Sequence, residues 1–164
     1  MIKMIVCVDN NGGIGRENEL LFNIKDDMKF FKETTTGQKV VMGYNTWLSL
    51  PKKPLPNREN YVLYNGEDNI EGAEVLRNLD DLVELGRTGV VFVIGGGMVY
   101  NDVIAAGIVD EAYITIVNTV TNADVFVDMY ELNKQLPCRE YIKNFEYGNT
   151  DVQLFRYHRG LFYI

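Results

Sequence analysis

The sequence predicts a single α/β domain, a layered sandwich with a central, mostly parallel, twisted sheet, helices on both faces and an antiparallel C-terminal hairpin. Two observations predict this fold class. Short apolar runs alternate with helix-length segments, as in parallel strands joined by crossover helices. Near the end of the chain, two β-rich runs at 141–147 and 152–158 are joined by Gly148 and Asn149, which is typical of a hairpin.

Composition and charge narrow the class of protein. The 164 residues, 46% of them hydrophobic, suffice for one ordinary core, so we expect residues 1–164 to form a single domain. The net charge of −7 argues against non-specific nucleic-acid binding and against an anionic membrane surface. No apolar run reaches the roughly 18 residues of a membrane span, and Asp9 and Asn10 interrupt any signal-peptide pattern.

The first apolar run, Ile2 to Val8, predicts a buried central strand. Turn residues with three glycines follow as far as Glu19, and we expect a loop without regular structure, either a plain surface loop or a lid over a site. For the next helix, Asn23 is the predicted N-cap, with Asp26 in the acidic position of a capping box.

The remaining elements follow from apolar runs and the residues that end them. Strands are predicted at 39–43, 60–64, 73–76, 90–94, 111–117 and 125–127. Helices are predicted over 44–50, stopped by Pro51; over 79–85, capped by Asn78 and closed by Gly86; and from 98 to Gly107.

One acid in the first helix lies on the apolar side. At about 100° per residue, Ile24, Met28 and Phe31 share a stripe, and Asp27 falls inside it. Burying a carboxylate costs on the order of several kcal/mol, so chains retain one mainly where a partner, a ligand or a reaction uses its charge. The alternative is an ordinary aspartate on the flank of a helix with a narrower apolar face.

Glycines stand where three predicted strands end: in the loop after Val8, at Gly43, and at Gly95 to Gly97. The last two sites also open helices, whose free amides suit a phosphate, although tight packing is an equal alternative. With His158 the only histidine, and Cys7 and Cys138 isolated and read as reduced thiols, no Cys–His, Ser–His–Asp or metal site is expected. A lone carboxylate beside a dinucleotide cradle indicates hydride transfer.

With these pieces in order, the chain resembles the dihydrofolate reductase family over essentially its whole length. The residues that carry the resemblance are Asp9, Gly13-Ile14-Gly15, Glu17-Asn18, Asn23, Asp27, Phe31-Lys32, Val40-Val41-Met42-Gly43, Thr46-Trp47, Ser49, Pro54-Leu55-Pro56, Arg58-Glu59-Asn60, Ile94-Gly95-Gly96-Gly97, Val99-Tyr100 and Thr115. Each piece is modest, but their order and spacing together are specific.

The resemblance implies NADPH-dependent reduction of 7,8-dihydrofolate to 5,6,7,8-tetrahydrofolate, in support of one-carbon metabolism and thymidylate synthesis. It implies that Asp27 is the only ionisable side chain in the pterin pocket, with its oxygens on the pterin's amidine edge. Asp27 would favour the tautomer that takes a proton at N5 while hydride reaches C6. The implied catalytic residues are Asp27, Thr115 and Phe22.

The resemblance also implies which residues bind the substrate and which bind the cofactor. Arg58 would pair with the α-carboxylate of the glutamyl tail. The implied substrate-binding residues are Ile5, Val6, Asp27, Met28, Phe31, Lys32, Leu50, Arg58, Ile94, Tyr100 and Thr115. The implied cofactor-binding residues are Cys7, Ile14, Gly15, Asn18, Gly43, Tyr44, Asn45, Thr46, Leu63, Asn65, Arg77, Gly95, Gly96, Gly97, Met98, Val99 and Tyr100. The stretch from Asp9 to Phe22 would be a mobile lid, and the family carries a cis peptide at Gly95-Gly96.

Four positions depart from the family pattern. Phe22 stands where a tryptophan is usual, and Leu21 replaces a common proline, so lid behaviour or turnover is expected to differ. Tyr44 and Met98 replace arginines near the cofactor phosphates, which weakens discrimination of NADPH from NADH. Arg77 and Asn65 remain as candidate contacts to the 2′-phosphate, so NADPH stays the expected cofactor.

Two other functions fit the same scaffold. A pyrimidine reductase of the riboflavin pathway lacks the buried helix acid, so Asp27 argues against it. A non-catalytic folate- or nucleotide-binding protein would not need acid, glycines and lid together. We therefore expect a cytoplasmic, monomeric enzyme that binds dihydrofolate and antifolate-type molecules, with no metal, nucleic-acid or membrane partner.

Overall fold

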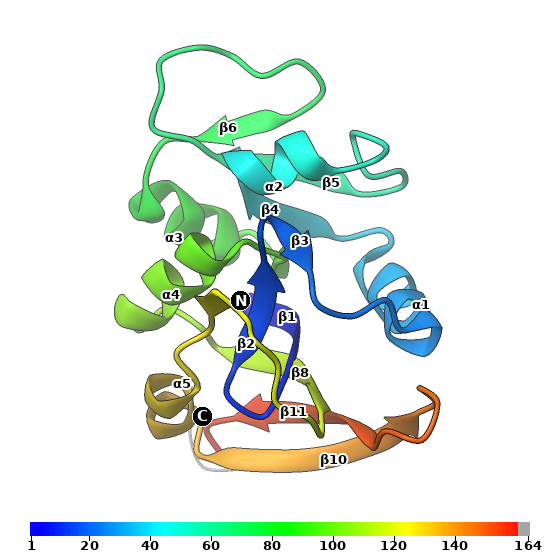
Figure 1. The fold of residues 1–164 in the computed structure, drawn as a ribbon. Helices are drawn as coiled ribbons and strands as arrows, with labels where there is room; N and C mark the ends of the chain where they lie inside the picture. Colours follow the sequence, from blue (N-terminus) through cyan, green and yellow to red (C-terminus); the bar gives the residue numbers. More distant parts are fainter. Residues whose placement is uncertain (161–164) are drawn as a thin grey trace.

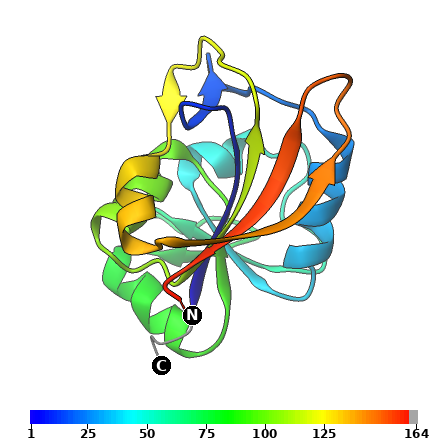
Figure 2. The ribbon, with the colours of Figure 1, turned by 90° about the horizontal axis from the view of Figure 1, so that it is seen from below.

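The fold is built on one large, twisted sheet with helices on either side of it (Figures 1 and 2). A computed structural model describes residues 1–160. The strands of this sheet are β1 (Ile2–Val8), β4 (Lys39–Gly43), β5 (Glu59–Leu63), β6 (Glu74–Leu76), β7 (Val91–Val93), β8 (Glu111–Val117), β10 (Cys138–Phe145) and β11 (Val152–His158). Their order is β10-β11-β8-β1-β7-β4-β5-β6. The pairs from β8 to β6 are parallel, and the β10–β11 hairpin is antiparallel, so the predicted sheet is confirmed.

Helices cover both faces of the sheet. They are α1 (Lys25–Thr35), α2 (Tyr44–Ser49), α3 (Leu79–Arg87), α4 (Gly97–Ala105) and α5 (Met129–Gln135). In both views α1 lies on one side, while α3, α4 and α5 lie on the other. The packing agrees, because Leu82, Ile104 and Leu132 of α3 to α5 share one core cluster and Phe31 and Trp47 of α1 and α2 join another.

Strand β1 lies at the centre of the sheet and is buried on both faces. Met4 and Val8 point into the cluster under α3 to α5, whereas Ile5 points into the cluster under α1 and α2. Alternate side chains of a strand face opposite sides, so a strand between two helical layers needs apolar residues at every position. The near-continuous apolar run from Ile2 to Val8 is explained in this way.

The predicted unstructured loop after β1 is wrong in part. It contains two short strands, β2 (Gly13–Arg16) and β3 (Glu19–Leu20), and β2 also pairs with β9 (Val125–Phe126) to form a second, three-stranded sheet. The partner strand is roughly 110 residues away in sequence, so local turn signals could not reveal this pairing.

Two predictions about helix ends are wrong, one at the start of α1 and one at the end of α3. Asn23 is exposed and does not cap α1; Ile24 is the N-cap, without a side-chain hydrogen bond. Asp26 Oδ2 instead accepts a hydrogen bond of 2.9 Å from the amide of Glu146, so a tertiary contact replaces the capping box. Gly86 lies within α3, which continues to Arg87; Asn78 caps this helix as predicted, by accepting from the amide of Asp81.

Helix α5 was not predicted. Its N-cap, Asp128, accepts a hydrogen bond of 3.1 Å from the amide of Glu131, and only Leu132 of its seven residues is buried. One buried residue in two turns gives no periodic signal. Among residues 1–160, no helix has both the length and the apolar character needed to cross a membrane.

Candidate active site

The acid that the sequence places on the apolar side of α1 meets a hydroxyl from the sheet. Asp27 lies in the first turn of α1 and is half-buried, and its Oδ1 accepts a hydrogen bond of 2.6 Å from Thr115 Oγ1. Thr115 is only 2% exposed and lies on β8, directly opposite Cys7 of β1. Helix α1 and the two central strands therefore converge on one carboxylate.

The charge of Asp27 is not balanced by a cation of the chain. Within residues 1–160, no lysine, arginine or histidine forms an ion pair with it. Burial raises the pKa of Asp27, and the hydrogen bond from Thr115 offsets only part of that rise. Such a carboxylate is costly to the fold and available to a ligand that brings hydrogen-bond donors.

Two neighbours feel the same charge. Burial raises the pKa of the Cys7 thiol, and the negative charge of Asp27 raises it further, so Cys7 stays a neutral thiol. The pKa of Tyr100 is raised by burial and then by Asp27 and Cys7. The hydroxyl of Tyr100 donates to the carbonyl of Ile5 over 2.8 Å, which ties α4 to β1 beside the acid.

Close packing at the ends of β4 and β7 leaves room only for glycine. The amide of Gly43 donates to the carbonyl of Gly95 over 2.9 Å, and the Gly95-Gly96 peptide is cis, as the resemblance implied. A Cβ atom at Gly96 would lie 3.0 Å from Thr46 Oγ1, and one at Gly97 would collide with Val125. Bare backbone and the starts of α2 and α4 thus form a cradle that a side chain would fill, which fits a dinucleotide phosphate.

Arg58 is oriented by its own chain. Its Nε donates to the carbonyl of Pro56 over 2.9 Å, and its Nη1 donates to Thr35 Oγ1 over 3.1 Å. The guanidinium also lies over the ring of Phe31, 5.9 Å from its centroid. Thr35 is fully buried and donates its own proton to the carbonyl of Phe31 over 2.8 Å. Three of the five guanidinium protons remain available to a carboxylate.

The predicted apolar wall residues differ in burial. Ile5 and Val6 are buried, and Phe31, Leu50 and Ile94 are half-buried in the cluster beside α1 and α2 or at its edge. Met28 is 58% exposed, so its predicted place in the buried stripe of α1 is wrong. A narrower stripe explains this, because α1 packs through Ile24, Phe30 and Phe31. Lys32 is exposed on the same helix.

The predicted contacts to the cofactor's adenosine end lie near the ends of β5 and β6. Leu63 ends β5, and Asn65 is exposed just beyond it. Arg77 follows β6 and donates to the carbonyls of Gly66, Glu67 and Asp68, the last over 2.9 Å. The ring of Tyr44 packs against Tyr64, with 4.7 Å between centroids, and Met98 is 79% exposed.

The predicted lid is fastened at both ends. Ile14 is buried, and the carbonyl of Gly15 accepts from the amide of Asp124 over 2.9 Å. Asn18 has a positive φ of 65° in the turn between β2 and β3. Phe22 ends the lid with its ring edge-on to Tyr147, 6.1 Å between centroids.

The anchor of this lid is Asp9, whose role the sequence did not reveal. Its carboxylate is 1% exposed and accepts hydrogen bonds from the amides of Asn11, Gly13 and Thr121 and from Thr121 Oγ1. The position of Thr121, 112 residues along the chain, leaves no local signal.

Known proteins show the same design. A family model described as dihydrofolate reductase matches residues 1–159. The chain belongs to the dihydrofolate reductase family. Dihydrofolate reductase of Staphylococcus aureus is 35% identical over 130 residues, 79% of each protein. The bifunctional dihydrofolate reductase-thymidylate synthase of Paramecium tetraurelia is 31% identical over 127 residues, 76% of this chain but only 28% of that protein.

A solved dihydrofolate reductase shares the fold. The enzyme from Enterococcus faecalis, in complex with NADP(H) and an inhibitor named RAB-propyl, superposes with a TM-score of 0.80 over 98% of this chain and 97% of its own, at 27% identity. For this member of the family, the geometry brings together Asp27, Thr115, Cys7, Tyr100 and the glycine cradle. The sequence assigned no role to Asp9, Thr35, Tyr64 or Thr121, each of which acts through a contact distant in the chain.

Proposed function

We propose that residues 1–164 form a single-domain, monomeric, cytoplasmic enzyme that reduces 7,8-dihydrofolate to 5,6,7,8-tetrahydrofolate with NADPH. Membership of the dihydrofolate reductase family supports the reaction. One observation in this chain carries it further: Asp27 is withdrawn from water, accepts one hydrogen bond, from Thr115 Oγ1, and has no cationic partner within residues 1–160.

Asp27 and Thr115 bind the pterin. The carboxylate has acceptor capacity left after the bond from Thr115, and the amidine edge of the pterin offers two parallel N–H donors. Binding there fixes the ring and favours the tautomer that accepts a proton at N5. Asp27 contacts the amidine edge of the pterin and thereby holds the substrate in its reactive tautomer. The carboxylate itself does not need to reach N5.

Apolar side chains orient the rings and exclude water. Ile5 and Val6 lie within β1 and Ile94 directly follows β7, while Phe31 and Leu50 come from α1 and the end of α2. Met28 and Lys32 are exposed on α1, and we propose that they contact the substrate from the solvent side of the site. Water exclusion strengthens the bonds to Asp27 and protects the transferred hydride from side reactions.

Arg58 binds the α-carboxylate of the glutamyl tail. Thr35 and Pro56 accept two of its protons and hold the guanidinium plane, so the free donors are preorganised for a bidentate contact. Arg58 forms no ion pair with Asp27 within residues 1–160, so each charged group is available to a different end of one substrate.

The glycine cradle and its surroundings hold the cofactor. When bound, NADPH supplies the hydride. Gly43, Gly95, Gly96 and Gly97 allow the backbone to approach the pyrophosphate, with Asn45, Thr46, Val99 and Tyr100 beside it and Cys7, Ile14, Gly15 and Asn18 nearer the lid. Leu63, Asn65, Arg77, Tyr44 and Met98 meet the adenosine end. Since Tyr44 and Met98 carry no charge, we propose a weak preference for NADPH over NADH.

Phe22 takes part as the residue that ends the lid. Its ring packs against Tyr147 and cannot donate a hydrogen bond, so Phe22 shields the pterin without holding an ordered water. We propose that antifolate-type molecules inhibit the enzyme when they present an amidine to Asp27, because their N–H groups donate to the same carboxylate as those of the substrate.

Two measurements test this function. Loss of NADPH absorbance on addition of dihydrofolate reports turnover, and size-exclusion chromatography with light scattering reports the mass of the active species. Turnover by a particle of one chain is expected. A protein that binds dihydrofolate and NADPH but turns neither over would be a binding protein, and the proposed function would be wrong.

A further inference from the structure

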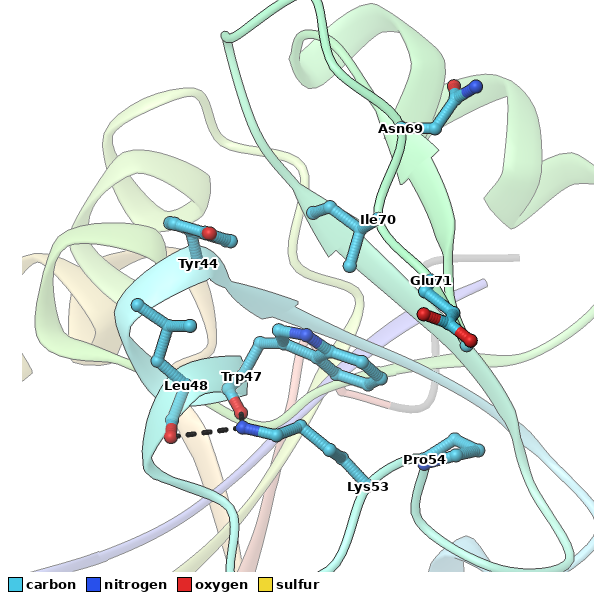
Figure 3. A pocket seen from close by; sticks show the side chains of 9 residues that line it. Tyr44, Trp47, Leu48, Lys53, Pro54, Asn69, Ile70 and Glu71 are labelled. Atoms are coloured by element: carbon cyan, nitrogen blue, oxygen red, sulfur yellow. Dashed lines mark hydrogen bonds between the residues drawn. The ribbon is translucent and has the colours of Figure 1, made fainter.

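The two helices that begin at the glycine cradle have different surroundings. Beside α2 lies an open groove of about 500 Å³, lined by Trp47 and Ile70 among others (Figure 3). Beside the start of α4, a strand of the second sheet packs against the helix instead. A Cβ atom at Gly97 would collide with the side chain of Val125, which belongs to β9. Strand β9 therefore forms one wall of the cradle at α4.

The strand that carries Val125 also pairs with the predicted lid. Gly15 of β2 lies opposite Val125, and Ile14 Cδ1 lies 3.8 Å from the position of the Cβ atom that Gly97 lacks. Ile14 and Val127 belong to one buried core cluster. The pyrophosphate of NADPH is proposed to bind at the start of α4, so the position of β9 bears directly on how the cofactor is held.

One side chain of α4 fastens this strand to the helix. Asn101 lies one turn beyond Gly97 and therefore on the same face of α4. Its Nδ2 donates to the carbonyl of Phe126 over 2.8 Å, and its Oδ1 accepts from the amide of Asp128 over 2.9 Å. Asparagine is unfavourable in the middle of a helix, because its amide competes for backbone groups. At Asn101 both ends of that amide are used by the segment 126–128.

We propose that Asn101 is a positioning residue for the cofactor, which holds the segment 126–128 on α4 and so keeps Val125 at the start of that helix as a wall for the pyrophosphate. The inference rests on the proposed place of the pyrophosphate at the glycine cradle. Without the two hydrogen bonds, β9 can leave α4, and the cofactor has to order it again on binding. That cost lowers the affinity for NADPH, whereas the pterin site on α1, β1 and β8 is unaffected.

The first test compares the two binding sites in the full chain. In Asn101→Ala, the dissociation constant of NADPH, measured by fluorescence titration, and KM for NADPH should both rise about threefold to tenfold. At saturating NADPH, kcat and KM for dihydrofolate should change less than about twofold. Gln135→Ala is the matched control, because it removes a hydrogen bond of 2.7 Å to the carbonyl of Ile104, near the other end of α4. An unchanged dissociation constant in Asn101→Ala, or an equal rise in both variants, would overturn the proposal.

A double-mutant cycle tests whether Asn101 acts through Val125. Val125→Ala removes the wall but keeps both hydrogen bonds of Asn101, and it should weaken NADPH about threefold through lost apolar contact. In the double variant, the effect on the dissociation constant should fall short of the product of the two single effects, because the clamp then has no wall to position. A full product would contradict the proposal. Turnover of dihydrofolate by the unaltered protein is a separate measurement, so this failure would leave the proposed function standing.

Discussion

Asp9 and Asp27 are two carboxylates that the fold withdraws from water, and neither has an ion-pair partner within residues 1–160. Asp9 receives four hydrogen bonds, three from amides and one from Thr121 Oγ1. Asp27 receives one, from Thr115. Burial acts on both, but at Asp9 the hydrogen bonds outweigh it and lower the pKa, whereas at Asp27 burial prevails and the pKa is raised.

The difference separates an acid that stabilises the fold from one kept for a ligand. A carboxylate whose lone pairs are met by the chain has nothing left to offer, and it fixes the loop that supplies the donors. A buried carboxylate with one donor can still accept hydrogen bonds from a ligand, and it destabilises the fold as long as no ligand is bound. Two arginines show the same contrast. The guanidinium of Arg77 donates hydrogen bonds to three carbonyls of the chain. The guanidinium of Arg58 donates two hydrogen bonds within the chain and has three N–H groups left for a ligand.

The largest effect is expected from Asp27→Asn. Turnover at pH 7 should fall about 100-fold or more, because the amide cannot accept from both pterin donors, and the loss should shrink in acid, where the substrate arrives protonated. The pH profile of kcat measures it. Asp26→Asn is the matched control, an exposed neighbour that bonds only the amide of Glu146. An unchanged pH profile for Asp27→Asn would remove the acid from the mechanism.

The same variant should be more stable than the unaltered protein at neutral pH. A raised pKa means that the folded state binds its proton more tightly than the unfolded chain, so stability falls as pH rises through the folded pKa. The asparagine carries no such cost, and its advantage should vanish below about pH 4, where the acid is protonated in both states. Urea unfolding at several pH values measures this; an advantage equal at all pH values would contradict it.

Asp9→Asn should have the opposite sign. With one oxygen lost as an acceptor, the variant should be less stable by about 2 kcal/mol at pH 7. The depressed pKa of Asp9 makes its contribution full above about pH 4 and lost as pH falls through the folded pKa, so the deficit should narrow in acid. Asp124→Asn is the control, because its carboxylate accepts a single exposed bond from Glu17. Equal deficits in the two variants would break the comparison.

Arg77→Gln tests the satisfied cation. In the unaltered protein, the ratio of kcat/KM for NADPH to that for NADH should be small. In Arg77→Gln it should be about threefold to tenfold lower, because the two guanidinium N–H groups that Arg77 has left for a phosphate are lost. Arg87→Gln, which loses only an exposed pair with Glu84, should leave the ratio unchanged. A ratio that Arg77→Gln does not move would make Arg77 purely structural.

The smallest effect is expected from Thr35→Val, which removes the acceptor that orients Arg58. KM for dihydrofolate should rise about threefold, while KM for NADPH and kcat stay constant. Thr35→Ser should restore the original KM, because it keeps the hydroxyl. Thr36→Val, whose hydroxyl bonds only the carbonyl of Lys32, is the control for the end of the helix. A fall in kcat as large as the rise in KM would indicate general disruption instead.

Residues that act within their own element could be predicted from the sequence. The eight strands of the large sheet follow from apolar runs, and Asp27 was found because a helix fixes which side chains share a face. Asn78 as an N-cap is equally local. In each case the decisive neighbours are fewer than five residues apart, so periodicity carries the information.

Residues whose partners are distant in the chain could not be predicted. Asp9 was read as one turn residue among several, because its donors on Thr121 lie across the molecule. Asn23 does not cap α1, and Asp26 accepts a hydrogen bond from the amide of Glu146 instead of completing a capping box. Met28 is exposed because α1 packs against the core through Phe30. Tertiary contacts overrode local preference at each of these positions.

The pairing of β2 with β9 has a kinetic consequence. Gly13 opposes Phe126, and Gly15 opposes Val125, so this ladder closes a loop of roughly 110 residues. We therefore expect this contact to form late in folding, once β1 and β8 have brought the two segments together, and we expect the second sheet to open locally as one unit. Amide hydrogen exchange at Gly15 and Val125 should therefore rise and fall together, faster than in β1.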